Sequence, residues 1–311
     1  MKRNILIPNS SLLTPNCLAL APLAGVTTLP VREFFSQHGA DLTHTEMISC
    51  AGLVRDNQKT FEMLKTSKLE KPLVVQLFAP DEKVLISGAL KVREACENFF
   101  AFGINMACPM PKITKNFCGA ALLKRPETAA NMVRELKKLN LSVWVKIRKL
   151  EKESETLNFI EILANSGADN ICVHGRTAAQ RYEGLADKNI LKIAAKNFPN
   201  LISASGDVKT VEDIDEYFSY GCVCVMLARG AIANPFLFEE YRGINRDFDE
   251  RVEILINFAR RAEEIAGEHK ALIAMKRFAG AVLRFSHGSA EKRNLACMST
   301  SLEEIIKILK N

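Results

Sequence analysis

Short apolar segments alternate with amphipathic, helix-like segments along the first three quarters of the chain. Eight of them have the length and the β-branched composition of strands, namely residues 17–22, 41–47, 73–78, 102–106, 142–148, 170–175, 200–205 and 221–227. His44 and Thr45 make the second of these the most polar. Strict alternation of strand and helix gives right-handed βαβ units, and eight such units close a barrel. The pattern therefore predicts an α/β fold, a (β/α)8 TIM barrel.

Proline and capping residues mark the starts of the intervening helices. Pro80 with Asp81 opens one predicted helix, and Pro126 opens another. From about residue 246 onward there is only helical periodicity, and Thr300 with Glu303 resembles a capping box for the last helix. One face of this region is apolar, and it carries Val252, Leu255, Ile256 and Ala259. We therefore expect two domains, a barrel over residues 1–242 and a small all-helical domain over residues 243–311.

Composition fits a globular protein of a reducing compartment. The 311 residues are 48% hydrophobic, enough for a large core, and 42 basic against 36 acidic residues give a net charge of +6. Nine cysteines without a CxxC pair argue against a disulfide framework and a zinc site. No run is long and apolar enough to cross a membrane, and Pro8, Asn9, Pro15 and Asn16 interrupt any signal-peptide core. We expect a cytoplasmic protein with no obligate protein partner.

The predicted strand ends carry the chemistry-bearing residues. In a barrel of parallel strands the carboxyl ends meet at one rim, where active sites are built. Each polar group alone has a structural explanation, but eight such endings at one rim indicate a ligand site. The endings are Pro22 to Gly25, Glu46-Met47, Gln76, Asn105 to Cys108, Lys146 with Arg148, His174 with Arg176, Ser205 to Asp207, and Ala228 to Gly230.

Two sets of these residues indicate which kind of ligand the site would hold. The SASGD and MLARGAIANP segments supply glycines, backbone N–H groups and Arg229 where barrels bind phosphate. Gln76, Lys146 and His174 form a donor set suited to a planar ring with carbonyls and ring nitrogens. A lysine beside an electron-accepting ring stabilises its reduced anion, so FMN fits better than a sugar phosphate.

Cys108 ends the fourth predicted strand and begins a loop without acidic residues. This loop, residues 109–126, carries Lys112, Lys115, Lys124 and Arg125, which attract polyanions. The helical tail over residues 241–311 adds 13 basic against 10 acidic residues. On charge alone, that tail is equally consistent with a solvated face and with an RNA-binding face.

A set of motifs, in order, resembles the tRNA-dihydrouridine synthase family over residues 17–240, and more loosely in the helical tail. The motifs are APLAGVTTLPVREF, TEMIS, QLFAPD, INMACPMPKITKNFCGAALLKRPE, VKIR, HGRTAAQRYEGLAD, SGDV and ARGAIANPFLF. The resemblance implies an FMN-bearing barrel that reduces the carbon 5 to carbon 6 double bond of particular uridines in tRNA. It also implies NADPH as the reductant of the flavin.

By motif, the resemblance makes Cys108 the proton donor to carbon 5 of the uracil. It assigns Asn105, Arg176 and Tyr182 to the substrate side, with Arg176 supporting either substrate or flavin. It assigns FMN to Pro22, Leu23, Ala24, Gln76, Lys146, His174, Ser205, Gly206, Asp207, Ala228 and Arg229.

Two positions depart from the family pattern. Ala107 stands where the family commonly has glycine, which is tolerable unless the backbone there has a positive φ. Ser205 stands where the family commonly has asparagine in the phosphate loop. That substitution puts one cofactor contact in question, while the chemistry of Cys108 is unaffected.

Two other classes of protein share part of this pattern. An FMN barrel acting on a free pyrimidine, like a dihydroorotate dehydrogenase, explains the donor set but neither the basic loop nor the helical tail. An RNA-binding protein without catalysis explains the basic residues but not the retained Cys108, Lys146 and His174. A metal enzyme is disfavoured because the five histidines form no close-spaced ligand pair.

Overall fold

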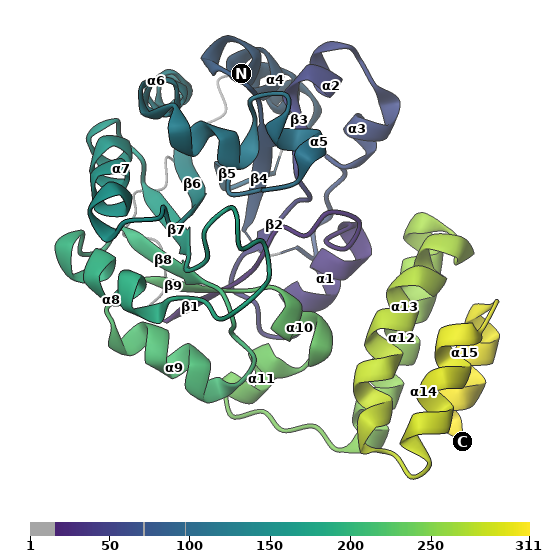
Figure 1. Cartoon of the computed structure of the whole chain (residues 1–311). Coiled ribbons are helices and arrows are strands. Elements are labelled where there is room, and N and C mark those ends of the chain that lie inside the picture. The colour runs from purple at the N-terminus through teal and green to yellow at the C-terminus, as the bar shows by residue number, and fades with distance from the viewer. Residues whose placement is uncertain (1–15, 71, 97) are drawn as a thin grey trace.

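A computed structural model describes residues 16–70, 72–96 and 98–311, so most of the segment considered above as a signal peptide lies outside the described residues. Its strands form one parallel sheet in the order β1-β9-β8-β7-β6-β5-β4-β2, with β3 paired to β4 (Figure 1). A bridge between Ala19 and Leu42 joins the two ends of this sheet. The predicted (β/α)8 barrel is thereby confirmed. The strands are β1 Cys17–Leu20, β2 Thr43–His44, β3 Ile48–Ser49, β4 Leu73–Phe78, β5 Ala101–Met106, β6 Ser142–Arg148, β7 Asn170–His174, β8 Ile202–Ser205 and β9 Cys224–Leu227.

The second predicted strand, residues 41–47, is not one continuous element. It is divided into β2 and β3, with Thr45 to Met47 between them. The hydroxyl of Thr45 accepts the N–H of Gln76 at 2.9 Å, a position that a backbone carbonyl fills in a regular ladder. The Glu46 carboxylate accepts the N–H of Gly25 at 2.5 Å. A side chain has therefore replaced a ladder partner at Gln76, and a second side chain holds the turn after β1.

Helices surround the barrel as the alternation requires (Figure 1). The Asp81 carboxylate caps α4 by accepting the N–H of Val84, and Pro126 occupies the first turn of α6, both as predicted. The helices of the barrel region are α1 Leu29–Gln37, α2 Cys50–Val54, α3 Gln58–Glu62, α4 Glu82–Ala95, α5 Pro111–Thr114, the 3-10 helix η2 Gly119–Lys124, α6 Pro126–Lys137, α7 Glu153–Asn165, α8 Lys188–Asn197, α9 Val211–Ser219, α10 Arg229–Ala233 and α11 Leu237–Tyr241.

A helical unit follows the barrel, and the predicted division at residue 242 falls in the segment before its first helix. On α12, Val252, Leu255 and Ala259 are buried as the periodicity indicates, and Ile256 is half-buried. The last helix is capped by Ser301, which accepts the N–H of Glu304, so the predicted cap at Thr300 is wrong by one residue. The elements are α12 Phe248–Ala266, α13 Glu268–Val282, the 3-10 helix η3 Leu283–Phe285, α14 Ser289–Met298 and α15 Leu302–Lys310.

The helical unit packs on the barrel through α1. The ring of Phe34 lies 5.2 Å from that of Phe258 and 5.3 Å from that of Phe278. The buried carboxylate of Glu33 pairs with the Arg261 guanidinium at 2.9 Å. These aromatic and ionic contacts fix α12 and α13 beside the barrel rim. Within the described residues, no helix is long and apolar enough to cross a membrane.

Candidate active site at the barrel rim

Asn105 positions the backbone that carries Cys108. It is the penultimate residue of β5, and its side-chain oxygen accepts the N–H groups of Ala107 and Cys108 at 3.2 and 3.0 Å. Its amide nitrogen donates to Gln76 Oε1 at 2.9 Å. Ala107 does not have a positive φ, so its methyl group causes no strain where the family pattern has glycine. The Asn105 side chain thus fixes the backbone of the loop that follows β5.

Arg148 holds the same loop from the neighbouring strand. At the end of β6, its Nε donates to the Ala107 carbonyl at 2.8 Å. Its Nη1 donates to the carbonyls of Thr177 and Arg181 at 3.0 and 2.7 Å. Arg148 therefore ties the Cys108 loop to the loop after β7. The sequence pattern includes Arg148 among the strand endings but does not assign it to the site, although, two residues after Lys146, it shares the same face of the strand.

A cavity of about 310 Å³ lies at the carboxyl ends of the strands, in the range typical of ligand sites. Gln76 and Arg176 do not line it; both lie behind residues that do. Met47, Met110, Arg148 and Lys209 are lining residues that were not predicted. The predicted residues that line it are Pro22, Leu23, Ala24, Asn105, Cys108, Lys146, His174, Tyr182, Ser205, Gly206, Asp207, Ala228 and Arg229.

Cys108 is half-buried at the edge of this cavity. Desolvation raises the pKa of its thiol above the ordinary value, against the smaller opposing effects of the Met110 N–H and the Arg148 charge. The thiol therefore stays neutral at physiological pH despite the basic loop around it. A neutral thiol is a proton donor, whereas a nucleophilic cysteine must be a thiolate.

Lys146 and His174 contribute two N–H donors of different charge. The Lys146 ammonium lies 3.4 Å from the Ser205 hydroxyl, and no carboxylate of the described chain forms an ion pair with it. The Arg176 backbone N–H donates to Nδ1 of His174 at 3.1 Å, so the neutral ring carries its proton on Nε2. Desolvation and the Lys146 charge lower the pKa of His174 to about 2, which keeps this ring neutral.

Asp207 organises the loops after β7 and β8. It has a left-handed φ of 49°, and its carboxylate accepts from Arg176 Nη2 at 2.7 Å and from the Ala186 N–H at 2.8 Å. Burial acts to raise the pKa of this carboxyl, but these donors hold it below its ordinary value. Gly230, in α10 after β9, lies against the loop after β8. A Cβ atom on Gly230 would lie 2.0 Å from the Val208 carbonyl, so only glycine allows these two segments to approach so closely.

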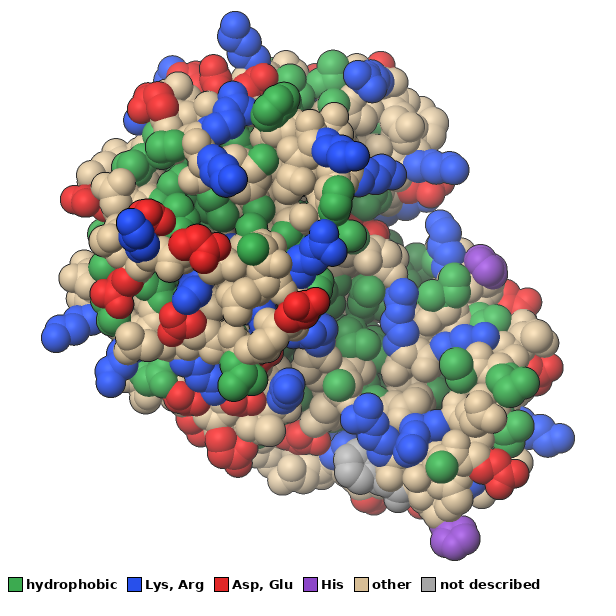
Figure 2. Space-filling view, in the orientation of Figure 1, with side chains coloured by type: hydrophobic (Ala, Val, Ile, Leu, Met, Phe, Trp, Pro, Cys, Tyr) green, Lys and Arg blue, Asp and Glu red, His purple; other side chains and the backbone are tan. Residues whose placement is uncertain are grey.

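Tyr182 stands at the mouth of the cavity with 54% of its surface exposed. The guanidinium carbon of Arg229 lies 5.0 Å from its ring centroid and that of Arg148 lies 5.5 Å away. Two cations thus hold an exposed aromatic ring in place. Elsewhere on this face, Lys and Arg side chains gather along the boundary between barrel and helical unit (Figure 2). Among the described residues, no group of three His, Cys, Asp or Glu side chains is arranged to hold a metal ion.

Comparison with known proteins places this site in a family. The family model described as dihydrouridine synthase matches residues 19–298. A probable tRNA-dihydrouridine synthase of Aquifex aeolicus is 28% identical over 93% of each chain. One from Rhizobium leguminosarum bv. phaseoli is 32% identical over 71% of this chain and 70% of the relative.

A solved structure gives independent support for the fold. Morphinone reductase in complex with tetrahydroNAD superimposes with a TM-score of 0.54 over 77% of this chain and 92% of its own, at 13% identity. At that identity the likeness concerns the fold alone. The family match covers nearly the whole chain, including the loops that build the cavity. The chain therefore belongs to the dihydrouridine synthase family.

Proposed function

We propose that the protein is a tRNA-dihydrouridine synthase that binds FMN, is reduced by NADPH, and saturates the carbon 5 to carbon 6 bond of particular uridines in tRNA. The observation that carries the proposal is one cavity at the strand ends, lined by a neutral thiol at Cys108, the Lys146 ammonium and the neutral ring of His174. The relatives named above carry the same activity in their names. A tRNA substrate and a nicotinamide reductant support a cytoplasmic location, which is part of the proposal.

The donor set of the cavity fits a flavin. A Lys146 ammonium with no ion-paired carboxylate among the described residues and the Nε2–H of His174 suit the carbonyls and ring nitrogens of an isoalloxazine. The loop with Gly206 at a φ of 123°, together with Arg229, suits its phosphate. Pro22, Leu23, Ala24, Ser205, Asp207 and Ala228 would complete this site, while Gln76 and Arg176 would support it from behind.

When bound, the flavin supplies the hydride that adds to carbon 6 of the uracil. The residues of the chain then have to deliver a proton to carbon 5 and hold the ring in place. Cys108 is the proton donor, since its raised pKa keeps the proton on sulfur until charge develops on carbon 5. Asn105 and Arg148 position Cys108 through the backbone bonds described above, and Tyr182 closes the substrate side.

The tRNA must present an unstacked uridine, because a base inside the folded RNA does not reach the cavity. The basic residues of the 109–126 loop and of the helical unit would hold the surrounding phosphates. A flavin enzyme for free pyrimidines would need neither set. A catalytically inactive RNA-binding protein would need neither the cavity donors nor a neutral thiol.

Two measurements test the proposal. Mapping of dihydrouridine in tRNA from cells lacking the gene should show a lost modification and identify its position. In vitro, Cys108→Ala should retain bound flavin and its reduction by NADPH but lose dihydrouridine formation by about 100-fold or more. Cys118→Ala, a buried thiol of the same loop, is the matched control and should remain active. A colourless protein that does not take up FMN, or an active Cys108→Ala variant, would contradict it.

A further inference from the structure

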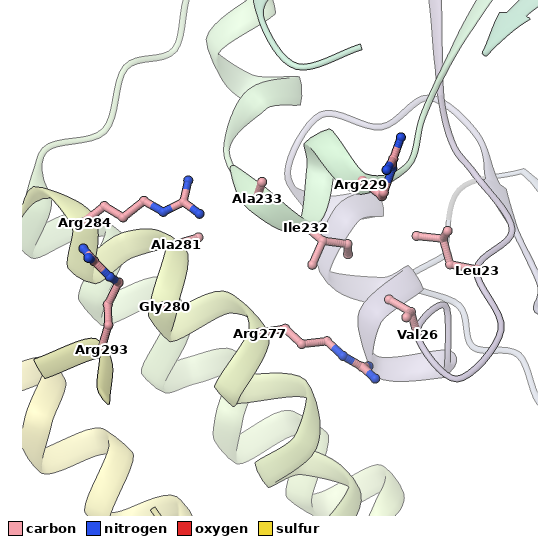
Figure 3. A pocket seen from close by; sticks show the side chains of 10 residues that line it. All are labelled: Leu23, Val26, Arg229, Ile232, Ala233, Arg277, Gly280, Ala281, Arg284 and Arg293. Carbon is pink, nitrogen blue, oxygen red and sulfur yellow. The ribbon is translucent and has the colours of Figure 1, made fainter. Parts of the chain in front are cut away.

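A second cavity, of about 710 Å³, lies between the barrel and the helical unit (Figure 3). Leu23 and Arg229 line both this cavity and the catalytic one. The two spaces are therefore neighbours that share a wall. Nothing in the chemistry proposed for Cys108 uses the second cavity, although its volume suits a nucleoside.

The floor of the second cavity is apolar. Leu23, Val26 and Ile232 project into it from the barrel, opposite Ala281 of α13 (Figure 3). Beside Ala281, Gly280 has no side chain, and a Cβ atom there would meet nothing within 4 Å. Such a floor does not favour a phosphate group, but it suits the face of a flat ring.

The rim of the second cavity is cationic. Four arginines line it, Arg229, Arg277, Arg284 and Arg293, and no acidic residue is among its lining residues. The Arg229 guanidinium itself faces the ring of Tyr182 and the carboxylate of Asp207 in the first cavity. Arg277 donates to the Gly25 carbonyl at 2.8 Å and Arg293 to the Ser289 hydroxyl at 3.1 Å. Arg284 makes no hydrogen bond or ion pair with any described side chain. Guanidinium groups both bind phosphates and stack on unpaired bases.

We propose that this cavity holds a second unstacked nucleoside of the RNA substrate, a neighbour of the target uridine in the same strand. Its base would lie on the floor of Leu23, Val26 and Ile232, and its flanking phosphates would contact Arg277, Arg284 and Arg293. The inference rests on the proposed function. It gives the enzyme a way to select a uridine by an adjacent unpaired nucleotide. The strand would pass from one cavity to the other beside Arg229, which lines both.

A steric series at Gly280 tests the proposal. Gly280→Phe places a ring in the cavity from α13, at a position where a Cβ atom meets nothing within 4 Å, whereas Gly280→Ala adds only a methyl group. With a tRNA transcript, we expect Gly280→Phe to bind about tenfold more weakly, the effect of losing one stacked base. Gly280→Ala should bind like the wild type. Ala290→Phe, an exposed position on α14 outside the cavity, should also bind like the wild type.

Salt dependence separates base binding from phosphate binding. Gly280→Phe should leave the slope of log affinity against log salt unchanged, because it removes no phosphate contact. Arg284→Gln should reduce that slope by about 0.7, the value for one phosphate of a single strand. Ala233→Phe fills the same cavity from α10 and should reproduce the effect of Gly280→Phe if the latter variant is poorly folded.

Three results would overturn the inference. The first is an equal tRNA affinity of the two Gly280 variants. The second is a salt slope of Gly280→Phe that differs from that of the wild type. The third is a raised KM of Gly280→Phe for NADPH, measured in flavin reduction without RNA. The last would assign the cavity to the nucleotide of the reductant. Absence of dihydrouridine formation by the wild type would instead contradict the proposed function, and the binding comparison would still report on the cavity.

Discussion

The Nε–H of Arg148 donates to the carbonyl of Ala107, the residue before Cys108, at 2.8 Å. The same guanidinium donates to two carbonyls of the loop after β7. The planar guanidinium group of arginine can donate to three carbonyls at once. A lysine ammonium at the end of a flexible side chain cannot bind them in the same geometry. The position of the Cys108 thiol therefore depends on the shape of Arg148 as well as on its charge.

Arg148→Lys should slow dihydrouridine formation by about 100-fold, because a small displacement of a reacting group has an effect of this size. Flavin reduction by NADPH should persist. The measurement is single-turnover oxidation of the reduced enzyme by tRNA. Arg134→Lys, in an exposed ion pair on α6, is the matched control and should behave as the wild type. Equal rates in both variants would rule out this role for Arg148.

The rate of that single turnover should vary little between about pH 6 and about pH 8. Desolvation raises the pKa of Cys108 above its ordinary value of 9.0, so the thiol is protonated throughout this range. As pH rises further through the raised pKa, the proton is lost and the rate should fall. A rate that already declines between pH 6 and pH 8 would mean a thiolate at Cys108 and would refute the acid role.

His44 should make the fold sensitive to acid. It is buried with Nδ1 donating to the Leu20 carbonyl, and desolvation lowers its pKa from 6.5 to about 4. The unfolded chain therefore takes up this proton first, and stability present above pH 6.5 is lost as pH falls toward 4. The loss from this residue between about pH 7 and about pH 5 is about 2 kcal/mol.

The free energy of unfolding in urea, measured across that interval, checks this expectation. His44→Gln should lower stability at neutral pH and flatten the dependence on pH, because the group that titrates is gone. His174 shifts in the same direction and contributes a further loss that the variant retains. An identical pH dependence in wild type and variant would show that His44 does not titrate on unfolding.

Gly230→Ala should disturb the loop proposed to hold the flavin phosphate. The new methyl carbon would lie 2.0 Å from the Val208 carbonyl, so the backbone has to move, at a cost of about 1–3 kcal/mol. We expect a lower melting temperature and reduced flavin content in the purified protein. Gly280→Ala, in open space on a helix, should instead raise stability by about 0.5–1 kcal/mol. Full flavin content in Gly230→Ala would contradict the expectation.

Local sequence determined the elements of this protein and the rim on which its polar residues meet. Strand and helix periods are short-range properties, and parallel closure places every strand end on the same side, so Cys108, Lys146 and His174 had to share one site. The order of the sequence motifs indicated the family, and the comparison with the family model confirms it over residues 19–298. None of these features depends on the distances between loops.

Tertiary structure alone decided how the site is supported and what lies beside it. Gln76 and Arg176 lie behind the cavity, Arg148 spans two loops, and the second strand divides where the Thr45 side chain replaces a ladder partner. The second cavity joins Leu23 to Arg293, residues that no local pattern relates. Each of these features depends on packing between segments that are distant in the sequence, because hydrogen bonds and cavities are set by distances in space. Sequence periodicity indicates only which face of a helix or strand is buried.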